Sequence, residues 1–212
     1  MSLLRILEYD CVQRVSLEGT TLDVGGGSRS DYNPLLSVRG KLQTVNLDPS
    51  MEPAFVADLN RGLPVATSSY NSIVSLNTLE HIQQDTLLLE EMFRVLKPGG
   101  SLCVLVPFLY RVHASPSDYH RHTACFWAEA LRHIGFPPSG MTIEPLTFGP
   151  LTAPLSLVEF SFPAGMRSLL RVGALLVPLL RGKLRRRGLL DDGRDTPLDY
   201  WIVARKQKGS SR

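Results

Sequence analysis

The 212-residue sequence has little cysteine, few aromatic residues and no marked excess of charge. Its three cysteines, Cys11, Cys103 and Cys125, are widely spaced and form no Cys-x-x-Cys pair, so we interpret them as reduced thiols. The 23 Lys and Arg residues nearly balance the 20 Asp and Glu residues, which argues against a nucleic-acid partner. The length and the 43% of apolar residues favour a single domain over residues 1–212.

Long uninterrupted apolar segments are also missing. Residues 1–15 mix charged with apolar residues, unlike a signal peptide, and we expect a cytoplasmic location. The longest apolar stretch, Leu169 to Leu180, contains Arg171 and Pro178. It is shorter than the roughly 20 residues that span a bilayer, so we expect no transmembrane helix. The polar residues 206–212 predict a disordered tail.

What is present is an alternation of short apolar runs, turn residues and segments of helical spacing. The runs of strand length are Thr21 to Val24, Leu42 to Leu47, Phe55 to Ala57, Ser72 to Leu76, Ser101 to Phe108, Glu144 to Phe148 and Leu198 to Ala204. Helical spacing predicts helices over Asp85 to Lys97, with Asp85 as its cap, and over Thr123 to Ile134. This order predicts an α/β fold with a mostly parallel seven-stranded sheet and helices on both faces.

Polar residues or glycines follow the predicted strands, at the edge where open α/β sheets bind ligands. The turn Gly25-Gly26-Gly27 allows the main chain to approach a ligand closely. The second strand ends at Asp48, about twenty residues beyond the glycines, where a carboxylate can accept both hydroxyls of an adenosine ribose. A nicotinamide cofactor is disfavoured because Ser30 stands where a third glycine would permit close helix packing, and because a Tyr-x-x-x-Lys pair is absent.

Five segments together resemble a known family. LDVGGGS, NLD, FVADLNRGLP, YNSIVSLNTLEHI and FRVLKPGGSLCVLVP, within residues 21–136, are similar to the class I methyltransferases of the type 11 group. The resemblance implies a Rossmann-like sandwich and S-adenosyl-L-methionine as the cofactor. Arg29 departs from the family pattern, because a third glycine often stands there.

The resemblance assigns cofactor contacts to Asp23, Gly25, Gly26, Gly27, Asp48, Asp58, Leu59, Asn77, Glu80 and His81. It implies that the glycine turn passes the methionine part of the cofactor, with Asp23 near its amino group. Asp48 would hold the ribose, and Asp58 with the backbone of Leu59 would lie near the adenine. The remaining residues would close the site after the fourth strand.

The segment after the fifth strand, FLYRVHASPSDYHRHT, is the densest cluster of polar residues in the chain. In the family such a segment faces the methyl acceptor, so one histidine could act as general base; His113 is our first choice and His120 our second. We expect acceptor contacts from Asp118, Tyr119 and Arg121. The alternative is that the histidines are partly exposed hydrogen-bonding groups. A metal site of three histidines and Asp118 would draw all its ligands from one loop, and we expect no metal because a sulfonium is already an activated methyl donor.

Residues 151–195 predict a variable, lid-like insertion between the last two strands. Within it, the apolar stretch from Met166 to Leu180 precedes five basic residues between Arg181 and Arg187. Such an element suits a lid over an apolar acceptor or peripheral membrane contact through residues 166–187. The alternative is an ordinary buried helix with a solvated basic end.

Two functions are consistent with these patterns. The first is an S-adenosylmethionine-dependent methyltransferase that acts on a small-molecule, glycan or lipid-like acceptor, with oxygen, nitrogen and carbon all open as the methylated atom. The second is a catalytically inactive S-adenosylmethionine-binding protein of the same fold with a regulatory or assembly role. The oligomeric state is open in both cases.

Overall fold

The computed structural model describes residues 2–149, 151–158, 161–163, 165–169, 172–173 and 193–209. Its main sheet has seven strands in the order β5-β4-β2-β6-β7-β9-β8. These are β2 (Thr21–Val24), β4 (Leu42–Asn46), β5 (Phe55–Val56), β6 (Tyr70–Leu76), β7 (Leu96–Pro107), β8 (Met141–Leu146) and β9 (Asp199–Arg205). Only β9 runs antiparallel to its neighbours, so the predicted mostly parallel sheet is confirmed.

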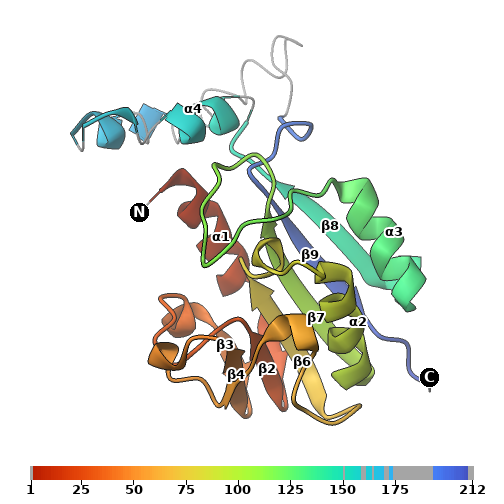
Figure 1. Ribbon diagram of the computed structural model, residues 1–212. Coiled ribbons are helices and arrows are strands. Elements are labelled where there is room, and N and C mark those ends of the chain that lie inside the picture. Colours follow the sequence, from red (N-terminus) through yellow and green to blue (C-terminus); the bar gives the residue numbers. More distant parts are fainter. Residues whose placement is uncertain are drawn as a thin grey trace.

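A second, two-stranded parallel sheet pairs β1 (Ser16–Glu18) with β3 (Ser37–Arg39). The α-helices in the described part of the chain include α1 (Leu3–Gln13), α2 (Asp85–Val95), α3 (Ala124–Ile134) and α4 (Thr152–Val158). Short 3-10 helices occupy Asn33–Leu35, Pro49–Met51, Leu59–Arg61, Leu79–His81 and Pro138–Gly140. Figure 1 shows α2 and α3 on one side of the main sheet and α1 on the other.

The central strand β7 is buried on both faces because successive side chains in a strand point to opposite sides. Leu102, Val104 and Val106 join the core formed with α2 and α3. Cys103 and Leu105 join the second core, in which α1 packs. Helix α1 presents Leu4, Glu8, Cys11 and Val12 as its buried face. The apolar second half of β7, from Leu102 to Pro107, thus reflects its position between two helical layers.

Of the two residues predicted to cap helices, Thr123 does so and Asp85 does not. Thr123 caps α3 as expected, since its hydroxyl accepts a hydrogen bond from the Phe126 amide, and Gly135 ends this helix with φ of 119°. Asp85 does not cap α2: it is the first helical residue, and Gln84 holds the cap position without a side-chain bond. One Asp85 carboxylate oxygen lies 2.8 Å from Nε2 of His122.

Residues 25–36, which follow β2, form the 3-10 helix Asn33–Leu35 and no α-helix, because glycine, serine and a proline dominate this stretch. The predicted tail begins with a buried residue: the ammonium of Lys206 donates to the carbonyls of Phe93 and Leu96, at the end of α2.

Most of the predicted lid and membrane-contact segment, including all five basic residues between Arg181 and Arg187, lies outside the described residues. In the part of the chain that is described, no helix has the length and apolarity needed to cross a membrane.

Candidate functional site

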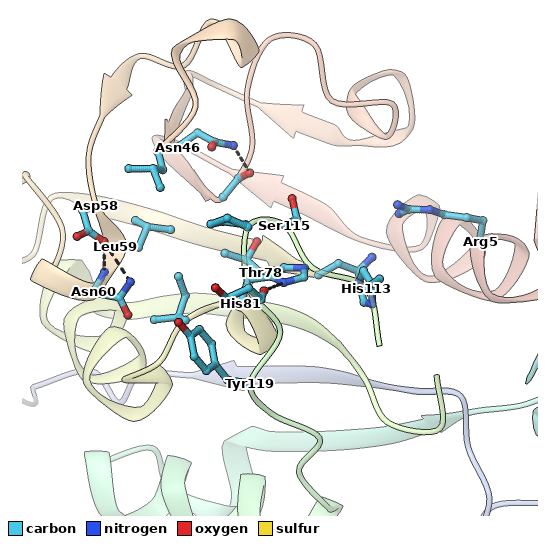
Figure 2. A pocket seen from close by; sticks show the side chains of 16 residues that line it. Arg5, Asn46, Asp58, Leu59, Asn60, Thr78, His81, His113, Ser115 and Tyr119 are labelled. Carbon is cyan, nitrogen blue, oxygen red and sulfur yellow. Dashed lines mark hydrogen bonds between the residues drawn. The ribbon is translucent and has the colours of Figure 1, made fainter. Parts of the chain in front are cut away.

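A cavity of about 340 Å³ opens at the edge where the parallel strands end (Figure 2). The chain reaches it from β2, β4, β5 and β6 and from the loop after β7, because parallel strands bring their carboxyl ends to one edge. Helix α1 adds one residue. The lining residues are Arg5, Gly25, Asn46, Leu47, Asp58, Leu59, Asn60, Asn77, Thr78, His81, Ile82, His113, Ser115, Pro116, Ser117 and Tyr119.

The glycine turn after β2 packs too closely for side chains. Gly25 has φ of 92°, and a Cβ on it would lie 2.1 Å from the Thr78 hydroxyl oxygen. A Cβ on Gly26 would lie 1.8 Å from an Asp23 carboxylate oxygen. The side-chain amide of Asn46 donates to the Gly25 carbonyl at 2.5 Å. The turn is therefore fixed between the ends of β4 and β6, with its backbone at the cavity.

Asp23 lies beneath this turn and does not line the cavity. It is fully buried, and one carboxylate oxygen accepts a hydrogen bond of 2.8 Å from the Tyr32 hydroxyl. The other oxygen has no partner among the described residues. Burial raises the pKa of Asp23 to about 7. A cationic group on a ligand at the turn would stabilise this carboxylate.

The raised pKa of Asp23 predicts a stability that depends on pH. Its ordinary pKa is 3.8, so between about pH 4 and 7 the folded chain keeps a proton that the unfolded chain releases. The free energy of unfolding should fall as pH rises through this range, by at most about 1.4 kcal/mol per pH unit from this group. Urea unfolding at several pH values should show a shallower decline in Asp23→Asn. The exposed control Asp31→Asn should follow the wild type. Equal slopes in wild type and Asp23→Asn would contradict the prediction.

The acidic residues after β4 and β5 each cap a 3-10 helix. Asp48 is exposed, and its Oδ1 accepts from the Ser50 amide at 2.8 Å; hydrogen bonds from Ser50 lower its pKa. Asp48 itself is not a lining residue, although the two preceding residues are. Asp58 lines the cavity and accepts from the amide and side chain of Asn60 at 3.0 and 3.1 Å. Leu59 is buried against the same wall.

After β6, Asn77 adopts a left-handed conformation with φ of 50°, and its side chain donates to Glu8 of α1 at 2.8 Å. Glu80 follows in the 3-10 helix Leu79–His81 and is 2% exposed. Neither of its carboxylate oxygens has a hydrogen-bond partner among the described residues. Burial raises the pKa of Glu80 to about 8.

His81 and His113 lie next to each other at the cavity (Figure 2), and both approach Glu80. Their rings are edge to face with centroids 5.0 Å apart. Nε2 of His81 lies 3.6 Å from Oε1 of Glu80, and Nε2 of His113 lies 3.8 Å from the same oxygen. The loop after β7 therefore brings its first histidine to the end of β6, as the sequence analysis anticipated for a group facing the cavity.

Asp118 and Arg121 hold this loop in shape. The guanidinium of Arg121 contacts both carboxylate oxygens of Asp118, at 2.5 and 2.7 Å, and holds the pKa of Asp118 at about 2. Asp118 also accepts from the His113 amide at 2.8 Å. Neither residue lines the cavity, so their contacts fit positioning of the loop better than the predicted acceptor contact. Tyr119 does line the cavity.

The remaining histidines lie elsewhere. His120 stacks on His122, and its Nε2 is 3.2 Å from the Gln83 carbonyl oxygen. His122 contacts Asp85 at the start of α2 and stacks on Phe126. The three loop histidines thus separate into two groups, and His120, our second choice for the base, does not line the cavity. They do not form one metal site with Asp118.

The sequence analysis missed the contribution of α1 and β9. Arg5 lines the cavity and binds the buried Glu8 at 3.0 Å. Asp199, at the start of β9, is fully buried, and burial with the nearby charges of Glu8 and Glu80 raises its pKa well above the ordinary value. In the sequence, Glu8 has helical spacing with the apolar residues Leu4 and Cys11. This spacing could have indicated that the Glu8 carboxylate is buried.

Comparisons with known proteins agree with this geometry. Residues 22–104 match a family model described as a methyltransferase domain. No curated protein matches the sequence. Among solved structures, a chain of the Haloferax volcanii complex between the Trm112 methyltransferase activator and a methyltransferase aligns with a TM-score of 0.63 and 18% identity, over 97% of this chain and 90% of that one.

Two further structures align over most of the chain. An S-adenosylmethionine-dependent methyltransferase from Thermotoga maritima has a TM-score of 0.60 and 17% identity, over 95% of this chain and 89% of that one. Phosphoethanolamine N-methyltransferase 2 of Haemonchus contortus, solved with S-adenosyl-L-methionine, has a TM-score of 0.55 and 17% identity; the alignment covers 97% of this chain and 52% of that one.

The fold is that of the class I, Rossmann-like methyltransferases. Residues 22–104 match the model of a methyltransferase domain of the type 11 group, which the sequence motifs also resemble. S-adenosyl-L-methionine is the cofactor of this family.

Proposed function

We propose that this protein is an S-adenosylmethionine-dependent methyltransferase that moves a methyl group to a small-molecule, glycan or lipid-like acceptor. The observation that carries the proposal is the cavity itself, which joins the glycine turn after β2 to His113 beyond β7. Its volume of about 340 Å³ lies within the range of small-ligand sites, which is about 300–1,000 Å³. The free cysteines fit our expectation that the protein acts in the cytoplasm.

The cofactor fits the half of the cavity nearest β2, β4 and β5. Its amino group would lie near the buried Asp23 carboxylate, and its carboxylate would meet the backbone of the turn. We assign the ribose to Asp48 and the adenine to the wall at Asp58 and Leu59. Arg29 does not obstruct this arrangement, because its guanidinium is bound to Glu52 in an exposed ion pair.

The acceptor fits the other half, beside His113 and Tyr119. Nδ1 of His113 lies 3.2 Å from the Arg111 carbonyl oxygen, which can only accept a hydrogen bond. The neutral ring then carries its proton on Nδ1 and leaves Nε2 free to act as a base. In the reaction, the acceptor atom attacks the methyl carbon as the carbon–sulfur bond breaks, Nε2 takes the acceptor's proton, and S-adenosylhomocysteine is released.

Cofactor binding tests the proposal directly. Asp48→Ala should weaken binding of S-adenosylmethionine by about 1.5–3 kcal/mol, the range for losing hydrogen bonds to a charged group. Calorimetric titration of wild type and variant measures this difference. Asp31→Ala, at another exposed aspartate near the turn, should bind like the wild type. Absence of binding to the wild type would refute the proposed function.

Turnover separates the proposal from its alternative. A catalytically inactive S-adenosylmethionine-binding protein would bind the cofactor normally and would transfer no methyl group to any small-molecule, glycan or lipid acceptor supplied with it. The proposed enzyme should release S-adenosylhomocysteine in an acceptor-dependent manner. Release of this product, measured over a panel of the three acceptor classes, decides between them.

A further inference from the structure

We propose that Glu80, His81 and His113 bind a divalent transition-metal ion such as Zn²⁺ at the acceptor end of the cavity. Each residue offers one ligand atom, and the three atoms lie within 4.8 Å of one another. The two distances to Oε1 of Glu80 are 3.6 and 3.8 Å. A tetrahedral zinc ion with ligand distances of about 2.0–2.2 Å separates its ligand atoms by about 3.3–3.6 Å, so small side-chain movements complete the site.

Both histidines are oriented as metal ligands. Nδ1 of His81 lies 2.5 Å from the Ser117 carbonyl oxygen, and Nδ1 of His113 lies 3.2 Å from that of Arg111. A carbonyl oxygen only accepts, so each Nδ1 carries the ring proton and each Nε2 presents a lone pair. Metal-binding histidines commonly have such an outer-shell partner, which fixes the tautomer and the ring orientation. The two Nε2 atoms face the same carboxylate oxygen.

Glu80 gives the second, independent reason for a ligand. Its side chain is 1% exposed, yet both carboxylate oxygens lack a hydrogen-bond partner among the described residues. Burial of a carboxylate without partners is costly, and a bound cation compensates for it. The charge of Arg121 compensates only in part, because Arg121 is paired with Asp118, and Arg5 is likewise paired with Glu8.

A second histidine cluster differs from the proposed metal site because its ligand atoms already have partners in the protein. Asp85, His120 and His122 also gather ligand atoms within 4.8 Å of one another. There, however, His122 already contacts one Asp85 oxygen at 2.8 Å, and the Thr86 amide donates to the other at 2.7 Å. Nε2 of His120 lies 3.2 Å from the Gln83 carbonyl oxygen. These ligand atoms are satisfied within the protein, whereas those beside Glu80 are not.

Three protein ligands leave a fourth position open, which is the arrangement of catalytic zinc sites. His81 and His113 line the cavity, so this position faces the proposed acceptor. An oxygen atom of the acceptor bound there would lose its proton more readily, and the metal would then replace His113 as the activating group. This consequence rests on the proposed function, but binding of the metal does not. The inference also replaces our sequence-based expectation of no metal.

Zinc binding to the full chain tests the inference. The protein, in a Cys125→Ser background that removes the exposed thiol, is stripped with a chelator and titrated with Zn²⁺ against a chromophoric chelator. We expect one zinc ion per chain, a stoichiometry that mass spectrometry of the loaded protein should confirm. Glu80→Gln should lower the affinity by more than about 100-fold, beyond the 10–100-fold typical of losing an outer-shell partner.

His120→Ala is the matched control, since it removes a histidine of the same loop outside the proposed site, and it should bind zinc like the parent. Circular dichroism verifies that each variant is folded; if Glu80→Gln is not, His81→Gln takes its place. Unchanged affinity in the folded ligand variant, or equal loss in His120→Ala, would overturn the inference. Titration of the stripped protein with S-adenosylmethionine reports on the proposed function, because Asp48, Asp58 and Leu59, to which we assign the ribose and the adenine, are not among the proposed metal ligands.

Discussion

His113→Ala is expected to lower the rate of methyl transfer by about 10²–10⁴-fold, the usual contribution of a general base, and to leave the affinity for S-adenosylmethionine nearly unchanged. The physical reason is that His113 lines the half of the cavity that we assign to the acceptor, whereas the proposed cofactor contacts come from β2, β4 and β5. Single-turnover rates and calorimetric titration on the same samples measure the two effects.

The matched control is again His120→Ala, which lies on the same loop but does not line the cavity. Its rate should equal that of the wild type. An unchanged rate in His113→Ala would make this histidine structural, and a parallel loss of cofactor affinity would place it in the wrong half of the cavity. Rates measured in chelator-stripped protein and again with added Zn²⁺ distinguish a base from a metal ligand: only a ligand variant should lose the response to zinc.

The second large effect is expected from Gly26→Ala. The added Cβ would lie 1.8 Å from a carboxylate oxygen of Asp23 and 2.5 Å from the hydroxyl oxygen of Tyr32. Both groups are held by their mutual hydrogen bond, so the backbone of the turn must shift. Forcing a methyl group into such a packed position costs about 1–3 kcal/mol of stability. Because the shift also moves the turn at the cofactor, affinity for S-adenosylmethionine should fall at least about tenfold.

Thermal unfolding and calorimetric titration measure these two effects. Gly165→Ala serves as the control, because a Cβ at Gly165 would meet no atom of the described residues within 4 Å. It should retain both the stability and the affinity of the wild type. Wild-type affinity in a folded Gly26→Ala variant would mean that the turn does not hold the cofactor.

Local patterns located most of the elements but not their exact ends. The predicted helix over Asp85 to Lys97 ends at Val95, because β7 begins at Leu96 and pairs with β6. The predicted strand Glu144 to Phe148 is found at Met141–Leu146, where its register is set by pairing with β9. Pairing with neighbouring strands sets the ends of these elements, so the ends cannot be predicted from the sequence of one segment alone.

The sequence also predicted some residues near the candidate site and missed others. Six residues that were predicted for the site line one cavity: Gly25, Asp58, Leu59, Asn77, His81 and His113. Asp118 and Arg121 were predicted for the acceptor but bind each other. Arg5, Glu8 and Asp199 come from the two ends of the chain, and no spacing along the sequence connects them to Glu80.

The resemblance to the type 11 methyltransferases implied the cofactor, and the sequence by itself determined the fold class and the sheet edge that carries the site. It could do so because strand period, glycine turns and helix caps are properties of neighbouring residues. Only the tertiary structure decided which histidine faces the cavity, which acids are buried without partners and which ion pairs merely hold a loop. These depend on contacts between segments as far apart as β6 and the loop after β7, where Glu80 lies 3.8 Å from His113. Burial of Glu80 between those segments, and not its place in the sequence, leaves both of its carboxylate oxygens without a hydrogen-bond partner among the described residues.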